Sequence, residues 1–215
     1  MILEPEQIKT VYRRLAPYYD GALIPLQLLG SMSYRRRAIE ALRLEQGDTV
    51  LDLGCGTGVN LPLLSEKVGP TGRVIGVDLS TDMLAQAARK VRELKLHNVT
   101  LVEKDIREYE PEVSVSGVIS TYALEMVPEH EELIEKMTEC LTDKGHMALL
   151  GLKHPESWPS WLVELGIWLT RPFGVNRAYE SIRPFESMQT HLDVGEYTEF
   201  LMGAAYLCVA KKHRI

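Results

Sequence analysis

The stretch VLDLGCGTG, residues 50–58, sets three glycines in five positions directly behind a segment of strand-type composition. Glycine lets the backbone turn sharply, and it lets a ligand lie against main-chain atoms because no Cβ stands in the way. Gly54, Gly56 and Gly58 therefore indicate that a ligand needs the space beside this turn. A tight structural turn without a ligand is the alternative interpretation of the glycines alone.

Strand-like and helix-like segments alternate along the chain from the glycine stretch onward. Strands separated by helices at this spacing form right-handed crossovers, which build a parallel sheet with helices on both faces. Ligands bind beyond the carboxyl ends of such strands, where the glycine turn lies. The expected strands are 50–53, 73–77, 99–103, 114–120 and 146–152, and the expected helices are 61–67, 81–94 and 130–141.

Two helices and a hairpin are expected outside this alternating core. Apolar residues at helical spacing predict a helix over 5–20, and residues 31–44 predict a second one with its basic residues on the outer face. Near the end of the chain, 196–201 and 205–210 predict two antiparallel strands joined through Gly203.

An acidic residue, Asp78, ends the second expected strand, twenty residues after Gly58. A carboxylate at that place accepts hydrogen bonds from the hydroxyls of a ribose. The glycine spacing is GxGxG, with Val59 where dinucleotide-binding chains carry glycine or alanine, and the sequence has no GxxxxGK[ST] phosphate loop. A nucleotide-like ligand is therefore expected, while a nicotinamide-dependent oxidoreductase stays the rival enzyme.

The chain resembles the class I S-adenosylmethionine-dependent methyltransferases in five segments that occur in the family's order and spacing. The resemblance implies a Rossmann-like α/β fold with a mostly parallel seven-stranded sheet, S-adenosyl-L-methionine as cofactor and S-adenosyl-L-homocysteine as product. The most similar group includes the ubiquinone and menaquinone C-methyltransferases and the small-molecule or lipid-amine N-methyltransferases. The segments are VLDLGCGTG (50–58), VIGVDLSTDML (74–84), VEKDIRE (102–108), VISTYALEMV (118–127) and LTDKGHMALLG (141–151).

The resemblance implies cofactor-binding roles for residues within these segments. The methionine part would border the glycine turn, the ribose would bind Asp78, and the adenine would meet Asp105 and Ile106. Thr121 would lie near the methionine part or the transferred methyl. Met83 and Ile106 are also what an ordinary core contains. The implied set is Asp52, Gly54, Cys55, Gly56, Asp78, Leu79, Met83, Asp105, Ile106 and Thr121, with Tyr19 from the N-terminal segment.

The segment VYRRLAPYYDG, residues 11–21, resembles the entry of that group, whose aromatic residues fold over the cofactor. Tyr12 and Tyr19 are thus candidate lid residues, although their helical spacing suits packing on the core equally well. The segment TYALEMVPEHEEL, residues 121–133, departs from the quinone enzymes. The resemblance therefore does not extend to a quinone substrate.

Methyl transfer is an in-line displacement whose sulfonium leaving group is already activated. The protein mainly aligns nucleophile and methyl at about 3–3.5 Å and excludes water, and an oxygen or carbon nucleophile also needs a proton acceptor. Glu125, His130 and His154 are the candidates near strand ends, but surface or capping roles are more common for such residues. The catalytic residues are therefore unknown from the sequence, and the Cys and His spacings predict no metal site.

All three tryptophans lie in ESWPSWLVELGIWLTRPFGV, residues 156–175. An expected helix there would carry Trp161, Leu165, Trp168 and Leu169 on one face. We favour a lid or a wall of the substrate pocket for it. Contact of residues 158–174 with a membrane surface is the alternative, because tryptophan favours headgroup depth. Either role indicates a sizeable apolar acceptor, a small molecule or a lipid-like one.

The whole sequence is that of one soluble domain. Its 215 residues suit one core, and its net charge of −6 argues against a nucleic-acid partner. Three cysteines without a CxxC pair and no signal-peptide pattern favour the cytoplasm, with peripheral membrane contact left open. A cofactor-binding subunit without chemistry is the non-enzymatic alternative, and the oligomeric state is not indicated. The expected division is a helical lid (1–45), a cofactor-binding core (46–153), a substrate-side insertion (154–192) and the hairpin (193–215).

Overall fold

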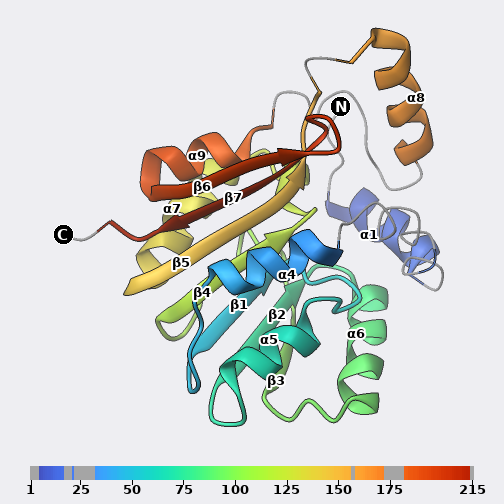
Figure 1. Cartoon of the computed structure of the whole chain (residues 1–215). Coiled ribbons are helices and arrows are strands. Elements are labelled where there is room, and N and C mark those ends of the chain that lie inside the picture. Colours follow the sequence, from blue (N-terminus) through green and yellow to red (C-terminus); the bar gives the residue numbers. More distant parts are fainter. Residues whose placement is uncertain (1–4, 17–20, 22–31, 156–157, 172–181, 214–215) are drawn as a thin grey trace.

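A computed structural model describes residues 5–16, 21, 32–155, 158–171 and 182–213. They form a seven-stranded sheet in the order β3-β2-β1-β4-β5-β7-β6 (Figure 1). Neighbours among β1 to β5 are parallel, whereas β7 runs antiparallel to both β5 and β6, so the predicted mostly parallel sheet with a C-terminal antiparallel hairpin is confirmed. The strands are β1 (Thr49–Leu53), β2 (Arg73–Asp78), β3 (Val99–Glu103), β4 (Val115–Thr121), β5 (Leu141–Leu152), β6 (Asp193–Phe200) and β7 (Ala205–Lys211).

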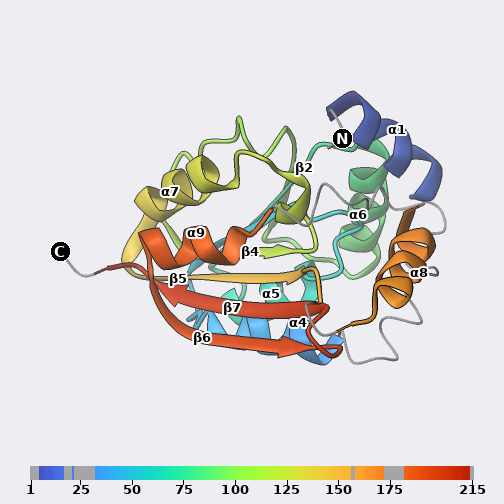
Figure 2. The same ribbon diagram turned by 90° about the horizontal axis from the view of Figure 1, so that it is seen from above.

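Helices cover both faces of the sheet, as predicted (Figures 1 and 2). On one face α4, α5 and α6 bury Ile39, Leu64 and Ala87, and on the other α7 and α9 bury Ile134 and Met188. Both views place α1 and α8 beyond the carboxyl ends of the parallel strands. The helices are α1 (Pro5–Leu15), α4 (Met32–Ala41), α5 (Leu61–Val68), α6 (Thr81–Glu93), the 3-10 helix η2 (Leu124–Met126), α7 (His130–Cys140), α8 (Ser160–Thr170) and α9 (Pro184–His191).

The central strands are covered on both faces, which is why their sequences are nearly continuous apolar runs. In β1 every residue from Val50 to Leu53 is buried, whereas exposed and partly buried residues alternate along the edge strand β6. Asp52 is the exception within β1, because it is a carboxyl with no accessible surface in a strand otherwise apolar from Val50 onward. A polar group at that depth indicates a polar network at the carboxyl end of the strand.

Strand β5 is longer than the sequence predicts, beginning at Leu141 instead of at 146. Its register against β4 shifts within this extra length, since Val115 pairs with Leu141 and Gly117 already pairs with His146. The residues between them include exposed polar side chains, so their sequence resembles a turn although the backbone stays extended. Pairing with β4 therefore makes β5 begin earlier than its local composition indicates.

Candidate functional site

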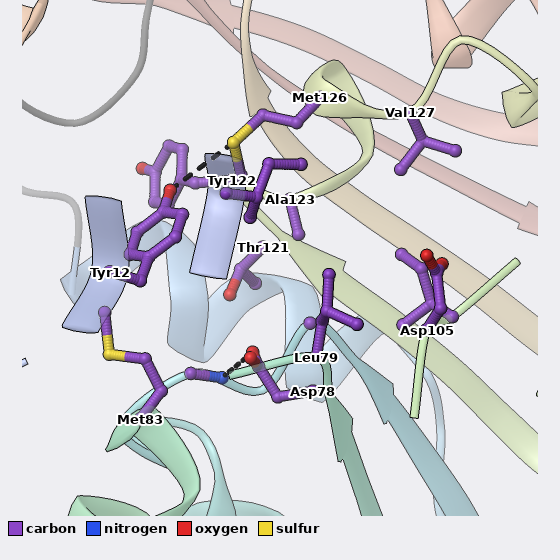
Figure 3. Close-up of a pocket in the computed structure, with 14 residues that line it drawn as sticks. Tyr12, Asp78, Leu79, Met83, Asp105, Thr121, Tyr122, Ala123, Met126 and Val127 are labelled. Carbon is purple, nitrogen blue, oxygen red and sulfur yellow. Dashed lines mark hydrogen bonds between the residues drawn. The ribbon is translucent and has the colours of Figure 1, made fainter. Parts of the chain in front are cut away.

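A pocket opens beyond the carboxyl end of β1, where the order of the sheet reverses because β2 lies on one side of β1 and β4 on the other (Figure 3). It brings together eight of the residues predicted to bind a cofactor. Its lining is Ile8, Tyr12, Gly54, Gly56, Asp78, Leu79, Met83, Asp105, Ile106, Thr121, Tyr122, Ala123, Met126 and Val127.

The turn after β1 has a backbone that only glycine adopts easily. Gly54, Gly56 and Gly58 all have positive φ, at 70°, 55° and 75°. A Cβ on Gly54 would lie 2.4 Å from the Cβ of Ala123, so the turn also approaches the segment after β4 too closely for a side chain. At Gly56 no atom lies within 4 Å of such a Cβ, which leaves the main chain open to the pocket. This geometry matches the predicted cradle for a ligand.

Asp78 joins the glycine turn to the beginning of α6. Its Oδ2 accepts a hydrogen bond from the Gly56 N–H at 2.8 Å (Figure 3). Its Oδ1 accepts one from the Ser80 N–H at 2.8 Å. Burial raises the pKa of this carboxyl above its ordinary value, and the backbone hydrogen bonds oppose that shift. Each carboxylate oxygen can accept a second hydrogen bond, so Asp78 can still bind a hydroxyl in the pocket.

Side chains after β2 and β3 form two sides of the pocket. The Ser80 hydroxyl caps α6 by accepting from the Met83 N–H at 3.3 Å, and so it fixes the first turn that bears Met83. Farther along the pocket, Arg107 donates to both oxygens of Asp105, at 2.7 Å for the shortest contact. Burial acts to raise the pKa of Asp105, but the hydrogen bonds from Arg107 outweigh it and lower that pKa. Asp105 is thus a charged acceptor held in place.

Four polar side chains form a network behind the glycine turn. Asn60 Nδ2 donates to both oxygens of Asp52 at 3.2 Å and to Thr121 Oγ1 at 3.1 Å. Arg35 Nη1 donates to Asn60 Oδ1 at 3.0 Å and also to Thr121 Oγ1. Burial raises the pKa of Asp52 to about 7, and the Asn60 hydrogen bond and the charge of Arg35 oppose the shift. Thr121 connects this network to the pocket.

The prediction that the basic residues of α4 lie on its outer face is wrong for Arg35, which is buried. The two arginines that follow it are exposed. Three consecutive helical residues span about 200° of the helix surface, so one face cannot hold all three. Arg35 is the one that points inward, where it contacts Asn60 and Thr121.

Three residues of the predicted cofactor set do not line the pocket that the structure describes. Asp52 is fully buried behind the glycine turn. Cys55 is buried with its Sγ 3.0 Å from where a Cβ of Gly76 would stand, so its thiol faces the sheet. Tyr19 lies outside the described residues. Their cofactor contacts stay predictions.

Helix α1 reaches the pocket through Ile8 and Tyr12. The Tyr12 Oη donates to the Sδ of Met126 at 3.4 Å, which connects α1 to the segment after β4 (Figure 3). Tyr12 was one of two candidate lid residues, and it does line the pocket.

The segment after β4 supplies more of the lining than the sequence predicts. Besides Thr121 it contributes Tyr122, Ala123, Met126 and Val127. Tyr122 adopts a φ of 59°, a left-handed conformation that non-glycine residues avoid and that clusters at functional sites. The available signal is the family-like segment VISTYALEMV, in which the resemblance predicts only Thr121 as a cofactor residue.

None of the three candidate proton acceptors lines the pocket. Glu125 is buried in η2 and accepts a hydrogen bond from the Tyr206 Oη at 2.8 Å, and burial raises its pKa to about 7. His130 Nδ1 lies 2.9 Å from the Ser187 Oγ, and burial lowers its pKa. His154 is exposed. The described residues also contain no group of three or more His, Cys, Asp or Glu side chains that could hold a metal ion.

Helix α8 has no buried side chain and contributes nothing to the described pocket. Trp161 and Trp168 are both 67% exposed, and Leu165 and Leu169 beside them are exposed as well. The predicted helical face therefore exists, but it does not form a wall of this pocket. Among the helices that the structure describes, α8 included, none is long and apolar enough to cross a membrane.

Comparison with known sequences gives a family match for the core of the chain. Residues 50–145 match a family model described as a methyltransferase domain. A demethylmenaquinone methyltransferase of Listeria welshimeri is 29% identical over 157 residues, which cover 73% of this chain and 66% of that protein. The chain thus spans slightly less than two thirds of the length of that relative.

Solved structures share the fold. A SAM dependent methyltransferase from Aquifex aeolicus has a TM-score of 0.59 at 21% identity, with 98% of this chain and 100% of that chain covered. A geranyl diphosphate C-methyltransferase from Streptomyces coelicolor A3(2), in complex with Mg²⁺, geranyl-S-thiolodiphosphate and S-adenosyl-L-homocysteine, has a TM-score of 0.68 at 17% identity, with 91% and 81% covered. At these identities the likeness establishes the fold alone.

Proposed function

Because residues 50–145 match a family model described as a methyltransferase domain and the sheet has the fold of solved methyltransferases, we propose that the protein binds S-adenosylmethionine and transfers its methyl group to a small apolar acceptor. One observation carries the proposal. The carboxylate of Asp78 and the main chain of Gly56 meet at 2.8 Å in the pocket at the point where the sheet order reverses.

The lining residues fit the cofactor in charge and shape. Asp78 can accept from the ribose hydroxyls, and Asp105 can accept from the amino group of the adenine ring beside Ile106 and Met83. The main chain at Gly56 can border the methionine part, because it is open to the pocket. When bound, the cofactor supplies an activated methyl group. The residues of the chain align the acceptor with it and exclude water.

An apolar acceptor is supported by the residues that follow Thr121. Tyr122, Ala123, Met126 and Val127 form an apolar wall, which α1 extends with Ile8. By their names, the relative from Listeria methylates demethylmenaquinone and the solved enzyme from Streptomyces methylates geranyl diphosphate, both of which carry isoprenoid carbon. A lipid-like acceptor is the corresponding proposal for this chain.

Contact with a lipid surface is the proposed role for α8, in the segment 154–192 that we assign to the acceptor side. The helix carries one acidic residue, Glu164, and its exposed face is formed by tryptophan and leucine. Such a face suits the headgroup boundary of a neutral bilayer. The net charge of −6 makes an anionic bilayer the less favourable surface. The protein would then take up a lipid-like acceptor from the bilayer that α8 contacts.

Turnover with paired acceptors tests the proposal. We would measure methyl transfer from labelled S-adenosylmethionine to a dihydroxynaphthalene and to the same ring bearing a prenyl chain. Burial of the prenyl chain against the apolar wall should make kcat/KM for the prenylated ring at least about tenfold higher than for the bare ring. Equal rates for both acceptors would contradict an apolar pocket. Cofactor binding without transfer to quinols, phenols or amines would favour the non-catalytic alternative.

A further inference from the structure

Glu125 is a buried carboxyl that the proposed function does not use. It lies in the middle of η2, and the two residues that follow it, Met126 and Val127, line the pocket. Only 9% of its surface is exposed, and it accepts a hydrogen bond from the Tyr206 Oη at 2.8 Å. An apolar side chain would cost less free energy at this depth, so packing alone does not explain a glutamate there.

Gly151 of β5 leaves the space that the Glu125 carboxyl occupies. A Cβ on Gly151 would overlap the Glu125 Oε1 and would lie 2.8 Å from the Tyr206 Oη. Gly151 and Tyr206 are directly paired between β5 and β7, and Tyr206 is fully buried. Glu125 therefore enters a slot between two strands of the sheet that lie far from it in the sequence.

The geometry of η2 explains why this slot bears on the pocket. A 3-10 helix has three residues per turn, so its successive side chains point in three directions. Leu124 packs in the buried core, Glu125 enters the slot, and Met126 lines the pocket. The single turn has no side-chain cap, and its backbone bonds to Ala123 and Leu124 are local. Since so short a helix is not stable alone, the side chains of Leu124 and Glu125 must hold it in place.

We propose that Glu125 is a positioning residue for the acceptor, because its hydrogen bond with Tyr206 holds η2 so that Met126 and Val127 form the apolar wall. The inference rests on the proposed function and adds to it the pair of side chains that sets the affinity for an apolar chain. Met126 also accepts from Tyr12 of α1. The wall is thus held by Glu125 on the side of the sheet and by Tyr12 on the side of the pocket.

Two acceptors test this role in the Tyr206→Phe variant, which loses the donor and keeps the ring. We would measure methyl transfer to a dihydroxynaphthalene and to the same ring bearing a prenyl chain. KM for the prenylated ring should rise by about 3- to 10-fold, as expected for loss of one buried hydrogen bond. Its kcat should change by less than about twofold, because the wall binds the chain equally in the ground state and in the transition state. KM for the bare ring should also change by less than about twofold, because the bare ring has no chain to pack on the wall.

Substitutions of Glu125 test the same pair from the other side. Glu125→Gln retains an oxygen that can accept from Tyr206, whereas Glu125→Ala does not. At about pH 6, where the Glu125 carboxyl is mostly neutral, Glu125→Gln should keep KM for the prenylated ring within about twofold, and Glu125→Ala should raise it as Tyr206→Phe does. Adding Tyr206→Phe to Glu125→Ala should have no further effect on KM, because the pair is already broken.

Tyr197→Phe is the matched control. It is the same substitution in the neighbouring strand β6, and it removes a hydrogen bond from the Tyr197 Oη to the exposed Glu199 at 3.0 Å. It should leave KM for both acceptors unchanged. Calorimetric titration with S-adenosylhomocysteine should give the same affinity for Tyr206→Phe as for the unaltered protein, which also reports that the variant is folded.

Several results would overturn the inference. If Tyr206→Phe raised KM for both acceptors by the same factor, the pair would only support the fold. An unchanged KM for the prenylated ring, or a further effect of Tyr206→Phe in the Glu125→Ala protein, would show that the pair does not position the wall. Weaker binding of S-adenosylhomocysteine would place the effect of the pair on the cofactor instead. If the unaltered protein bound S-adenosylhomocysteine but methylated neither acceptor, the proposed acceptor class would fail and this inference with it.

Discussion

At the scale of single residues, the close contact between Gly54 and Ala123 has a measurable consequence. Gly54→Ala adds a Cβ at 2.4 Å from the Cβ of Ala123 and keeps a φ of 70° that alanine disfavours. We expect the free energy of unfolding to fall by about 1–3 kcal/mol or more, because the cost of backbone strain adds to the cost of overpacking. Urea denaturation measures it.

Gly166→Ala is the comparison for that substitution. Gly166 lies in α8, nothing lies within 4 Å of an added Cβ, and its φ is not positive. This variant should keep its stability or gain up to about 1 kcal/mol from helix propensity. A Gly54→Ala protein as stable as Gly166→Ala would mean that the turn is not held against the segment after β4.

Glu125 predicts a dependence of stability on pH. Its carboxyl has a pKa of about 7 in the folded chain against an ordinary value of 4.5. Between these values the folded chain binds more protons than the unfolded one, so the free energy of unfolding falls as pH rises. Glu125→Gln cannot ionise, and its amide oxygen can still accept from Tyr206. The variant should therefore be more stable than the unaltered protein by about 1–3 kcal/mol at pH 8 and nearly equal to it at about pH 4, below the ordinary pKa of a glutamate.

An exposed acid of α7 provides the control for Glu125. Glu132→Gln should leave the free energy of unfolding unchanged at both pH values, because Glu132 is exposed. Asp52 titrates identically in all three proteins and cancels from the differences. A Glu125→Gln variant that lost stability at pH 8 would show that the ionised pair with Tyr206 stabilises the fold.

At the scale of elements, α8 differs from the other helices in how much apolar surface it buries. The helices that cover the sheet bury apolar residues on it, whereas α8 leaves both of its tryptophans 67% exposed. Trp161→Ser and Trp168→Ser together should leave the melting temperature nearly unchanged, because both side chains bury little surface in the folded chain. The rate of methyl transfer to a soluble acceptor should change by less than about twofold. They should reduce sedimentation of the protein with phosphatidylcholine vesicles. Unchanged vesicle binding would contradict the proposed role of α8.

Most elements could be predicted from the sequence because their signals are local. Strand β3 and the cap of α6 at Ser80 follow from composition and from capping chemistry within a few residues. The beginning of β5 could not, since exposed polar residues stay extended there only through pairing with β4. The inward position of Arg35 depended on which side of α4 meets the sheet, which a short basic run does not specify.

At the scale of the whole molecule, the pocket collects residues from five separate parts of the chain. The glycine turn and Asp78 could be predicted because they lie at the carboxyl ends of strands that meet at one edge of the sheet. Asp105 could be predicted because the segment that contains it resembles the family. Ile8 and Met126 could not be predicted as lining residues. Their contribution depends on how α1 and the segment after β4 meet across the pocket, through Tyr12.

Calorimetric titration with S-adenosylhomocysteine and with NADH tests the central claim most directly, on the unaltered protein and on Asp78→Ala. We predict micromolar binding of S-adenosylhomocysteine and none of NADH. We also predict at least about tenfold weaker binding in Asp78→Ala, because the ribose loses hydrogen bonds to a charged acceptor. Folded protein that does not bind S-adenosylhomocysteine, or binding that Asp78→Ala leaves unchanged, would contradict the assignment of this pocket to the cofactor.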